Sequence, residues 1–162
     1  MKAIDTDTLK NILVTRTDRL GDVILSTPVF AALRCRYPQA RIIALVLPYT
    51  EPIIRTNPYV DDVIVYDKRG KQRQFLQTVV FTREIRRHAI DVAIHLHPTN
   101  RVHLLSFLAG IPIRIGYRRK MPFLLTHTIA DEKWRGEMHE AEYNFELLRF
   151  LDVEKPDILE PL

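Results

Sequence analysis

The sequence predicts an α/β fold, a Rossmann-like parallel sheet flanked by helices. Short apolar runs alternate with longer segments of helical periodicity along the chain, an order typical of strands joined by crossover helices. Residues 42–47 are entirely apolar, as expected of a central strand covered on both faces. The 162 residues, of which 46% are hydrophobic, suit one domain with its own core.

Six strands are predicted in chain order. The first is a short buried run that ends at Arg16, the second is the apolar run just described, and the sixth has the weakest pattern. Because helical segments separate the strands, the sheet is expected to be parallel and covered on both faces. The predicted strands are residues 11–16, 41–47, 61–66, 91–97, 112–116 and 126–130.

Helical patterns fill the gaps. The first helix is predicted from six positions that recur at helical spacing, namely Val23, Ile24, Thr27, Ala31, Ala32 and Cys35. Pro28 falls inside this pattern and removes a backbone donor, so a kink or a restart is expected there. Cys35 lies among apolar positions and is expected to be a packed thiol. The predicted helices are residues 22–36, 50–55, 72–88, 100–109 and 139–151.

The composition of the chain indicates its cellular compartment and the charge of its partners. One cysteine cannot form an internal disulfide, which fits a reducing cytoplasm. The sequence predicts neither a membrane span nor a secretion signal, because it has no apolar run of about 18 residues and no basic segment leading into one. The net charge of +4 favours an anionic partner.

The turn after the first predicted strand carries the residues best placed for chemistry. Ligands of parallel sheets bind outside the carboxyl ends of the strands, and Asp22 lies there, at the start of a helix. Gly21 is expected to permit a sharp turn and to let a bound group approach the backbone. Free N–H groups of the following turn favour a negative or hydroxyl-rich ligand. The sequence therefore predicts a crevice at this turn.

Three further loops are expected at the same edge of the sheet, at residues 67–73, 97–101 and 117–120. Their basic members would form a positive rim around a carboxylate-bearing centre, which suits a phosphorylated carbohydrate. The alternative for these cations is a solvated helix entrance. The candidate substrate-binding residues of the four loops are Arg19, Gly21, Lys68, Arg69, Lys71, Arg73, His97, Asn100, Arg118 and Arg119.

Several motifs together resemble one enzyme family. They are Arg-Thr-Asp-Arg-Leu-Gly-Asp-Val-Ile-Leu-Ser-Thr-Pro at 16–28, Leu33, Tyr-Pro-Gln-Ala-Arg-Ile at 37–42, Asn-Pro-Tyr-Val-Asp-Asp-Val-Ile at 57–64, Ile-Arg-Ile-Gly-Tyr at 113–117 and Met-His-Glu-Ala-Glu-Tyr-Asn at 138–144. This set is similar to the N-terminal motifs of the heptosyltransferases, family 9 of the glycosyltransferases, which add ADP-heptose to the lipopolysaccharide inner core. The resemblance covers nearly the whole chain.

The resemblance implies the N-terminal half of a GT-B glycosyltransferase. Residues 1–155 are then the acceptor-side domain, residues 156–162 the start of an interdomain linker, and the C-terminal nucleotide-sugar domain is absent. The implied partners are ADP-heptose as donor, a phosphorylated lipopolysaccharide core acceptor and the C-terminal domain of the same enzyme. The implied location is the cytoplasm, with peripheral contact at the inner face of the inner membrane. No cofactor or metal is implied.

Asp22 is the residue that the resemblance identifies as the general base of a single inverting displacement. The attacking hydroxyl must lose a proton as the leaving sugar develops oxocarbenium character, and a carboxylate can accept that proton. Asp18 is the second choice for this role. The alternative for Asp22 is a helix cap that accepts backbone N–H bonds.

Histidine spacing raises the possibility of zinc. His95 and His97 would point to one side of a strand, with His103 on the next helix, but no cysteine or carboxylate completes a set at familiar spacing. We therefore expect no metal, and we expect His97 to line the cleft. His139 and Glu140 are expected to cap the last helix, with a contact to the cleft as the alternative.

Two other function classes are compatible with a basic α/β domain. RNA binding is not expected, because aromatic residues do not punctuate the basic loops as stacking platforms would. A noncatalytic glycan- or phosphate-binding half-domain stays open as the rival, since the donor would find few contacts on this chain. The isolated chain is expected to be inactive.

Overall fold

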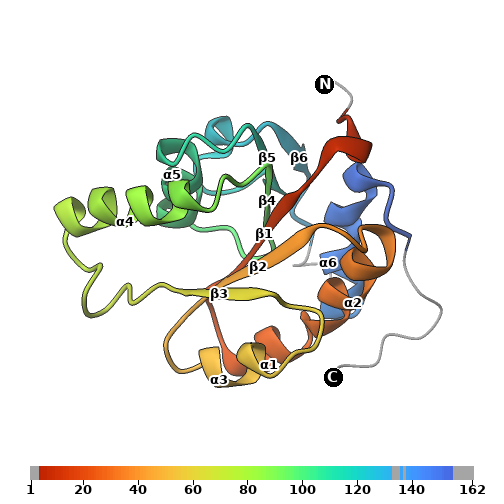
Figure 1. Cartoon of the computed structure of the whole chain (residues 1–162), viewed down its shortest axis with the longest axis horizontal. Coiled ribbons are helices and arrows are strands. Elements are labelled where there is room, and N and C mark those ends of the chain that lie inside the picture. Colours follow the sequence, from red (N-terminus) through yellow and green to blue (C-terminus); the bar gives the residue numbers. More distant parts are fainter. Residues whose placement is uncertain (1–3, 133–135, 137, 155–162) are drawn as a thin grey trace.

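The fold is a six-stranded sheet in which every neighbouring pair is parallel, in the order β3-β2-β1-β4-β5-β6 (Figure 1). This computed structural model describes residues 4–132, 136 and 138–154. All six predicted strands are confirmed, with bounds close to those expected. They are β1 (Asn11–Arg16), β2 (Arg41–Val46), β3 (Asp62–Val65), β4 (Val92–His95), β5 (Ile113–Tyr117) and β6 (His127–Ile129).

The helices also follow the predicted pattern. They are α1 (Leu20–Ile24), α2 (Thr27–Arg36), α3 (Glu51–Arg55), α4 (Phe75–Arg87), α5 (Asn100–Leu108) and α6 (Glu140–Leu148), with short 3₁₀ turns at Thr6–Thr8, Pro122–Leu124 and Arg149–Leu151. The expected restart at Pro28 is confirmed, because α1 ends before it and Pro28 is the second residue of α2. A proline there costs little, since the first N–H groups of a helix have no partner within the helix.

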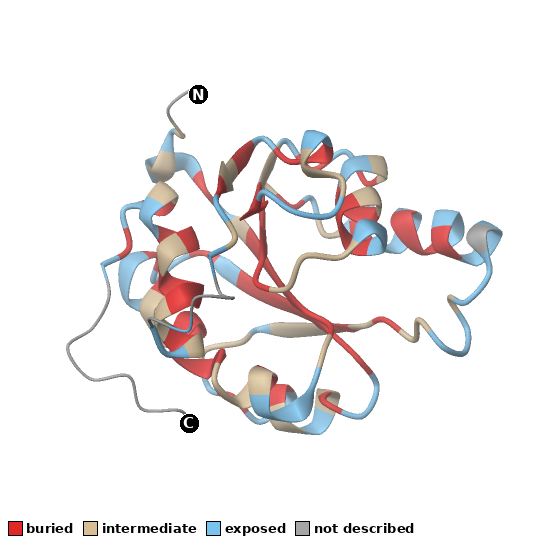
Figure 2. Ribbon diagram, turned by 180° about the vertical axis from the view of Figure 1, so that it is seen from behind, coloured by how far each residue is buried: buried red, intermediate tan, exposed pale blue. Residues whose placement is uncertain are grey.

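Helices cover both faces of the sheet (Figure 1). On one face, Ile12 and Val14 of β1 pack with Phe30 of α2 and Leu147 of α6. On the other, Leu13 of β1 belongs to a cluster with members of α4 and α5. Successive strand residues therefore enter opposite cores. Figure 2 shows the result, with the central strands buried and the outer sides of the helices exposed.

The expectation of a packed Cys35 is wrong, because Cys35 is exposed. The apolar face of α2 is formed by Val29, Phe30 and Leu33, which are at most 1% exposed. Two residues beyond Leu33, Cys35 lies on the opposite side of the helix, since residues two apart do not share a face. Ala31 and Ala32 are only partly buried.

The sheet has a switch point between β1 and β4. From β1 the chain builds outward through β2 to β3, and from β4 it builds the other way through β5 to β6. The loops that leave β1 and β4 therefore separate, and a crevice at this position is where open α/β sheets bind ligands. No helix in the described part of the chain is long and apolar enough to cross a membrane. The predicted linker, residues 156–162, lies outside the described residues.

Candidate active site

Arg16 ends β1 and joins four parts of the chain at the switch point. Its side chain is 3% exposed, and it points to the α6 side of the sheet. Every nitrogen of its guanidinium faces an acceptor. The pairs are Nε with Asp18 Oδ1 at 2.8 Å, Nη1 with Asn144 Oδ1 at 3.1 Å and with the Leu96 carbonyl at 3.4 Å, and Nη2 with Glu140 Oε1 at 2.9 Å and Asp22 Oδ1 at 3.5 Å.

Asp22 faces a cavity of about 410 Å³, called the first cavity below. Its side chain is one-third exposed, so the carboxylate is held by Arg16 on one side and open on the other. The first cavity is lined by Arg16, Asp18, Arg19, Asp22, His97, Pro98, Arg119, Lys120, Asp131 and Glu140. Its lining therefore comes from the end of β1, the loop after it and α1, from the loops after β4, β5 and β6, and from the start of α6.

The helix-cap alternative for Asp22 finds no support in the geometry. Arg19 occupies the N-cap position of α1. Asp22 lies within the first turn, and its carboxylate accepts no backbone N–H among the described residues. Its contact there is the Arg16 guanidinium, so the side chain is positioned by a fixed charge and not by the helix end.

Asp18 is held more tightly than Asp22. Its carboxylate is 12% exposed and lies 3.1 Å from His97 Nδ1 as well as 2.8 Å from Arg16 Nε. Burial alone would raise the pKa of Asp18, but the hydrogen bond from His97 and the charge of Arg16 outweigh it and hold that pKa below the ordinary value. Asp18 is therefore a weak proton acceptor, and its two partners leave it little freedom to reach a substrate.

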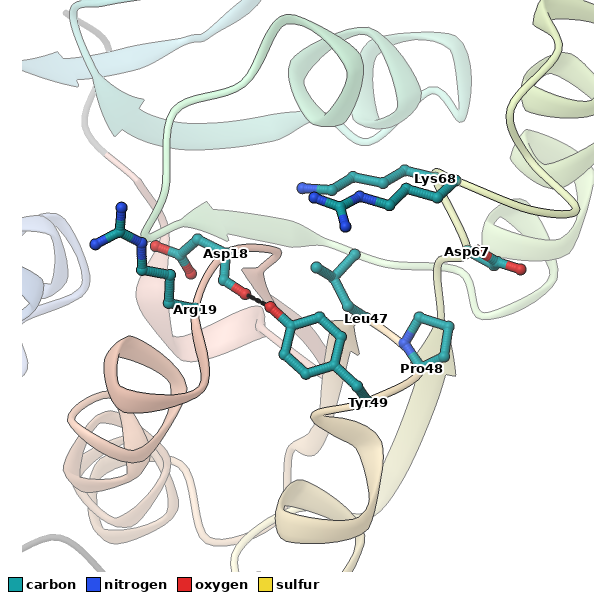
Figure 3. Close-up of a pocket in the computed structure, with 8 residues that line it drawn as sticks. Asp18, Arg19, Leu47, Pro48, Tyr49, Asp67 and Lys68 are labelled. Atoms are coloured by element: carbon teal, nitrogen blue, oxygen red, sulfur yellow. Dashed lines mark hydrogen bonds between the residues drawn. The ribbon is translucent and has the colours of Figure 1, made fainter.

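A second cavity of about 420 Å³ lies on the β2 and β3 side of Asp18 and Arg19 (Figure 3). Leu47, Pro48 and Tyr49 form its apolar part, and the Tyr49 hydroxyl donates to the Asp18 carbonyl. The other lining residues are Asp67, Lys68 and Arg69. Figure 3 shows the Lys68 side chain reaching across toward Asp18 while the Asp67 carboxylate points away. The second cavity combines an exposed aromatic ring with three cations, Arg19, Lys68 and Arg69.

The four cations of the loop before α4 do not converge. Lys68 Nζ donates to the Thr17 carbonyl at 2.7 Å, and burial followed by the charge of Arg69 lowers the pKa of Lys68. Arg69 lines the second cavity, whereas Lys71 and Arg73 are exposed and line neither cavity. The reason is local: the Asp67 carboxylate accepts the backbone N–H of residues 70 and 71 and folds the loop back on itself.

The loops after β4 and β5 contribute part of what was predicted. His97 and Arg119 line the first cavity, and Arg119 also lies 3.1 Å from Asp131. Lys120, next to Arg119, lines the same cavity. Arg118 is exposed and lines neither cavity.

Asn100 also lies outside both cavities, as the exposed first residue of α5. Thr99, the residue before it, caps α5 by accepting the Val102 N–H. The loop after β4 therefore reaches the first cavity through His97 and Pro98 and has turned into the helix by residue 100.

Gly21 differs from its predicted role in the turn. It is the second residue of α1 and has no left-handed φ, so the chain does not need glycine to turn there. A Cβ placed on Gly21 would meet no atom within 4 Å. The open space at Gly21 does leave room for a bound group near the backbone beside Asp22.

The predicted pairing of His95 and His97 on one strand face is wrong. β4 ends at His95, which is fully buried between Thr15 Oγ1 at 2.9 Å and Ser106 Oγ at 3.0 Å. His103 packs beside it, with ring centres 5.1 Å apart. His97 lies beyond the strand, beside Asp18. Among the described residues, no three His, Cys, Asp or Glu side chains form a group that could hold a metal.

Sequence reasoning gives two residues of the site no role. Arg16 is predicted only as the end of a strand and the start of the 16–28 motif, and the loop of Tyr49 is not one of the four loops expected at the crevice. For Glu140, a helix cap is expected, with a contact to the cleft as the alternative. His139 is in fact the capping residue of α6, while Glu140 turns to Arg16. The signals available were an arginine at the end of an apolar strand and a tyrosine directly after β2.

The sequence of this chain is similar to those of known glycosyltransferases. No protein-family model matches the chain. A protein of Haemophilus influenzae that carries the name glycosyltransferase is 32% identical over 155 residues, which is 94% of this chain and 44% of that protein. Lipopolysaccharide heptosyltransferase 2 of Escherichia coli is 27% identical over 118 residues, covering 73% of this chain and 34% of the enzyme.

Solved glycosyltransferase structures share the fold of this chain. The glycosyl transferase family 9 structure from Veillonella parvula superposes with a TM-score of 0.81 and 28% identity, over 99% of this chain and 45% of that one. The Escherichia coli ADP-heptose lps heptosyltransferase II shares the fold, with a TM-score of 0.72 at 24% identity over 86% of this chain and 40% of that one. The chain thus spans less than half the length of these relatives.

Proposed function

We propose that this chain, which is related to the family 9 glycosyltransferases, is the acceptor-side domain of an inverting heptosyltransferase. In the proposed reaction, heptose passes from ADP-heptose to a hydroxyl of the lipopolysaccharide inner core, at the cytoplasmic face of the inner membrane. A C-terminal domain of the same enzyme supplies most of the donor site. This chain supplies the base and the contacts to the acceptor.

The observation that carries the proposal is the open, Arg16-held carboxylate of Asp22 in the first cavity. In a single displacement, the acceptor hydroxyl loses its proton to Asp22, its oxygen bonds to the anomeric carbon, and ADP leaves with the electrons of the broken bond. A base placed in this way contributes roughly 10²–10⁴ in rate. Asp18 is unsuited to the role because His97 and Arg16 occupy its oxygens.

The cations of the two cavities suit a phosphorylated acceptor. Lys68 and Arg69 line the second cavity, and Arg19 lines both, so an anionic group bound there lies next to the pocket that holds Asp22. Arginine can bind phosphate through two parallel hydrogen bonds, which gives direction as well as charge. Tyr49 adds a ring face for a sugar in the same cavity.

The rival proposal is a noncatalytic glycan- or phosphate-binding half-domain. It is favoured by one observation: Arg19, Lys68 and Arg69 line the second cavity, of which Asp22 is not a lining residue, so an anionic group could bind there without any chemistry. Both proposals predict that the isolated chain binds a phosphorylated lipopolysaccharide core fragment. Only the enzyme proposal predicts transfer when the missing portion is supplied.

The deciding experiment adds the carboxy-terminal portion of the Haemophilus influenzae relative to this chain and measures transfer from ADP-heptose to a core fragment. Transfer that depends on both parts and is lost in Asp22→Asn supports the enzyme. Donor and acceptor binding by the combined protein without transfer supports the half-domain. Turnover by the isolated chain would show that the C-terminal domain is not required.

A further inference from the structure

The outward face of α4 is apolar in its first half and cationic in its second. Thr78, Phe81, Thr82 and Ile85 are buried and mark the inner face. On the opposite face, Leu76 is 74% exposed and Val80 is 56% exposed, with Val79 beside them at 37%. Arg83 and Arg87 continue the stripe of Leu76 and Val80 at helical spacing, and both are exposed.

Charge gathers on the same segment. Residues 71–87 hold five cations, namely Lys71, Arg73, Arg83, Arg86 and Arg87, against the single carboxylate of Glu84. Their excess of four equals the +4 of the whole chain, so the rest of the protein is balanced. Along the sequence, the exposed aliphatic side chains therefore lie between cations on both sides.

The fold leaves this face uncovered among the described residues. Figure 1 shows α4 on the outer flank, with its first half projecting past the sheet and past α5. Arg86 is turned inward, where its guanidinium donates to the carbonyls of Leu108 at 2.6 Å and Ala109 at 3.2 Å. Arg101 of α5 donates to the carbonyls of Lys68 and Arg73, both at 3.3 Å, and so ties down the loop that leads into α4.

We propose that the outward face of α4 docks on an anionic phospholipid surface. Leu76, Val79 and Val80 enter the boundary between headgroups and acyl chains, while Arg83 and Arg87 contact lipid phosphates, a division typical of helices that lie in the interface. The positive excess selects an anionic surface over a neutral one. The proposal rests on the membrane location in the proposed function and on none of its chemistry.

The test is sedimentation of the full 162-residue chain with unilamellar vesicles, of phosphatidylcholine alone or with about 30% phosphatidylglycerol. Binding is expected for the anionic vesicles and should weaken as salt rises. Leu76→Ser with Val80→Ser should lower the partition coefficient by about tenfold or more. Arg83→Gln with Arg87→Gln should lower it by roughly fivefold per charge removed.

Matched controls separate this face from general stickiness. Arg36→Gln with Arg55→Gln removes the same two charges from α2 and α3, and Phe123→Ser removes a side chain that is 75% exposed outside α4. Both should leave vesicle binding nearly unchanged. Circular dichroism should show that all variants keep the wild-type helix content.

Three outcomes would overturn the proposal. The control variants could lower binding as much as the α4 pairs, or the aliphatic pair could have no effect. Alternatively, sedimentation velocity could show that the chain self-associates through this face, which would identify a second copy as its occupant. Asp22→Asn should leave vesicle binding intact. A failure of docking is thereby distinguished from a failure of the proposed transfer reaction.

Discussion

The guanidinium of Arg16, at the end of the first strand, lies 2.9 Å from the carboxylate of Glu140, at the start of the last helix. The nitrogen that makes this contact, Nη2, also lies 3.5 Å from Asp22 Oδ1. One buried cation thus sets the distance between α6 and α1 across the mouth of the first cavity. The position of Asp22 depends on a contact between residues 124 positions apart in the sequence.

Arg16→Met should destabilise the fold strongly. It leaves the carboxylates of Asp18, Asp22 and Glu140 without the cation that pairs with them, and removal of one partner from a buried ion pair costs about 3–5 kcal/mol. Urea unfolding of the isolated chain measures this loss. Arg55→Met, which breaks an exposed pair with Glu51 on α3, should cost only about 0.3–0.5 kcal/mol. Equal losses in the two variants would mean that the Arg16 contacts contribute no more than surface pairs.

Asp22→Asn should lower kcat of the complemented enzyme by about 10²–10⁴ while acceptor affinity changes little, because the amide keeps the shape and loses the basicity. Asp18→Asn should reduce kcat less and should also lower the free energy of unfolding, since it breaks the contacts with Arg16 and His97. Steady-state kinetics and urea unfolding of both variants check this. A larger loss of kcat in the Asp18 variant would move the base to Asp18.

Gly70→Ala should disturb the loop before α4, and Gly21→Ala should not disturb α1. A Cβ on Gly70 would lie 2.1 Å from Asp67 Oδ2, so Asp67 must give up the backbone N–H groups it accepts and Lys68 must shift. A Cβ on Gly21 meets no atom within 4 Å, and alanine in a helix is favoured over glycine by up to about 1 kcal/mol. Gly21→Ala should therefore have the highest melting temperature, the wild type an intermediate one and Gly70→Ala the lowest. The reverse order would contradict the described loop.

Stability should fall as the pH drops below about 6.5, the ordinary histidine value. Burial lowers the pKa of His95 well below 6.5, and it lowers the pKa of His103 as well. Below pH 6.5 the unfolded chain binds protons that the folded chain does not, so each residue removes up to about 1.4 kcal/mol per pH unit from the free energy of unfolding. Above pH 6.5 both histidines are neutral in the folded and the unfolded chain, so they cause no such loss of stability.

Urea unfolding between pH 7 and pH 5 measures that slope. The double variant His95→Gln with His103→Gln should be less stable at pH 7, because it disturbs the bonds to Thr15 and Ser106, yet it should show a shallower loss on acidification. An unchanged slope in the double variant would assign the pH dependence to other groups.

The fold was predictable because its signals are local. The apolar run of β2, the restart at Pro28 and the alternation of strands with helices all follow from neighbouring residues. The loops of Asp18 and His97 are predicted to share one edge of the sheet, because both follow the carboxyl ends of parallel strands. These features needed no knowledge of side-chain packing.

The rest of the site depends on packing that the sequence pattern does not carry. Glu140 and His139 are adjacent and both suited to a helix start, and only the placement of α6 against β1 decides which one meets Arg16. Cys35 is expected to be buried because the apolar periodicity of α2 does not show which side of the helix faces the core. The structure buries Val29, Phe30 and Leu33 and leaves Cys35 exposed. The count of cations in the loop before α4 does not show that the Asp67 turn leaves Lys71 and Arg73 outside both cavities.

The first strand of the chain, β1, lies within the sheet, between β2 and β4. During synthesis on the ribosome, β1 can pair with β2 early, but its other edge waits until residue 95 has emerged, since Thr15 pairs with His95. Such an unpaired apolar edge invites association with other nascent chains. Expression at lower temperature or with added chaperones should therefore raise the yield of soluble protein.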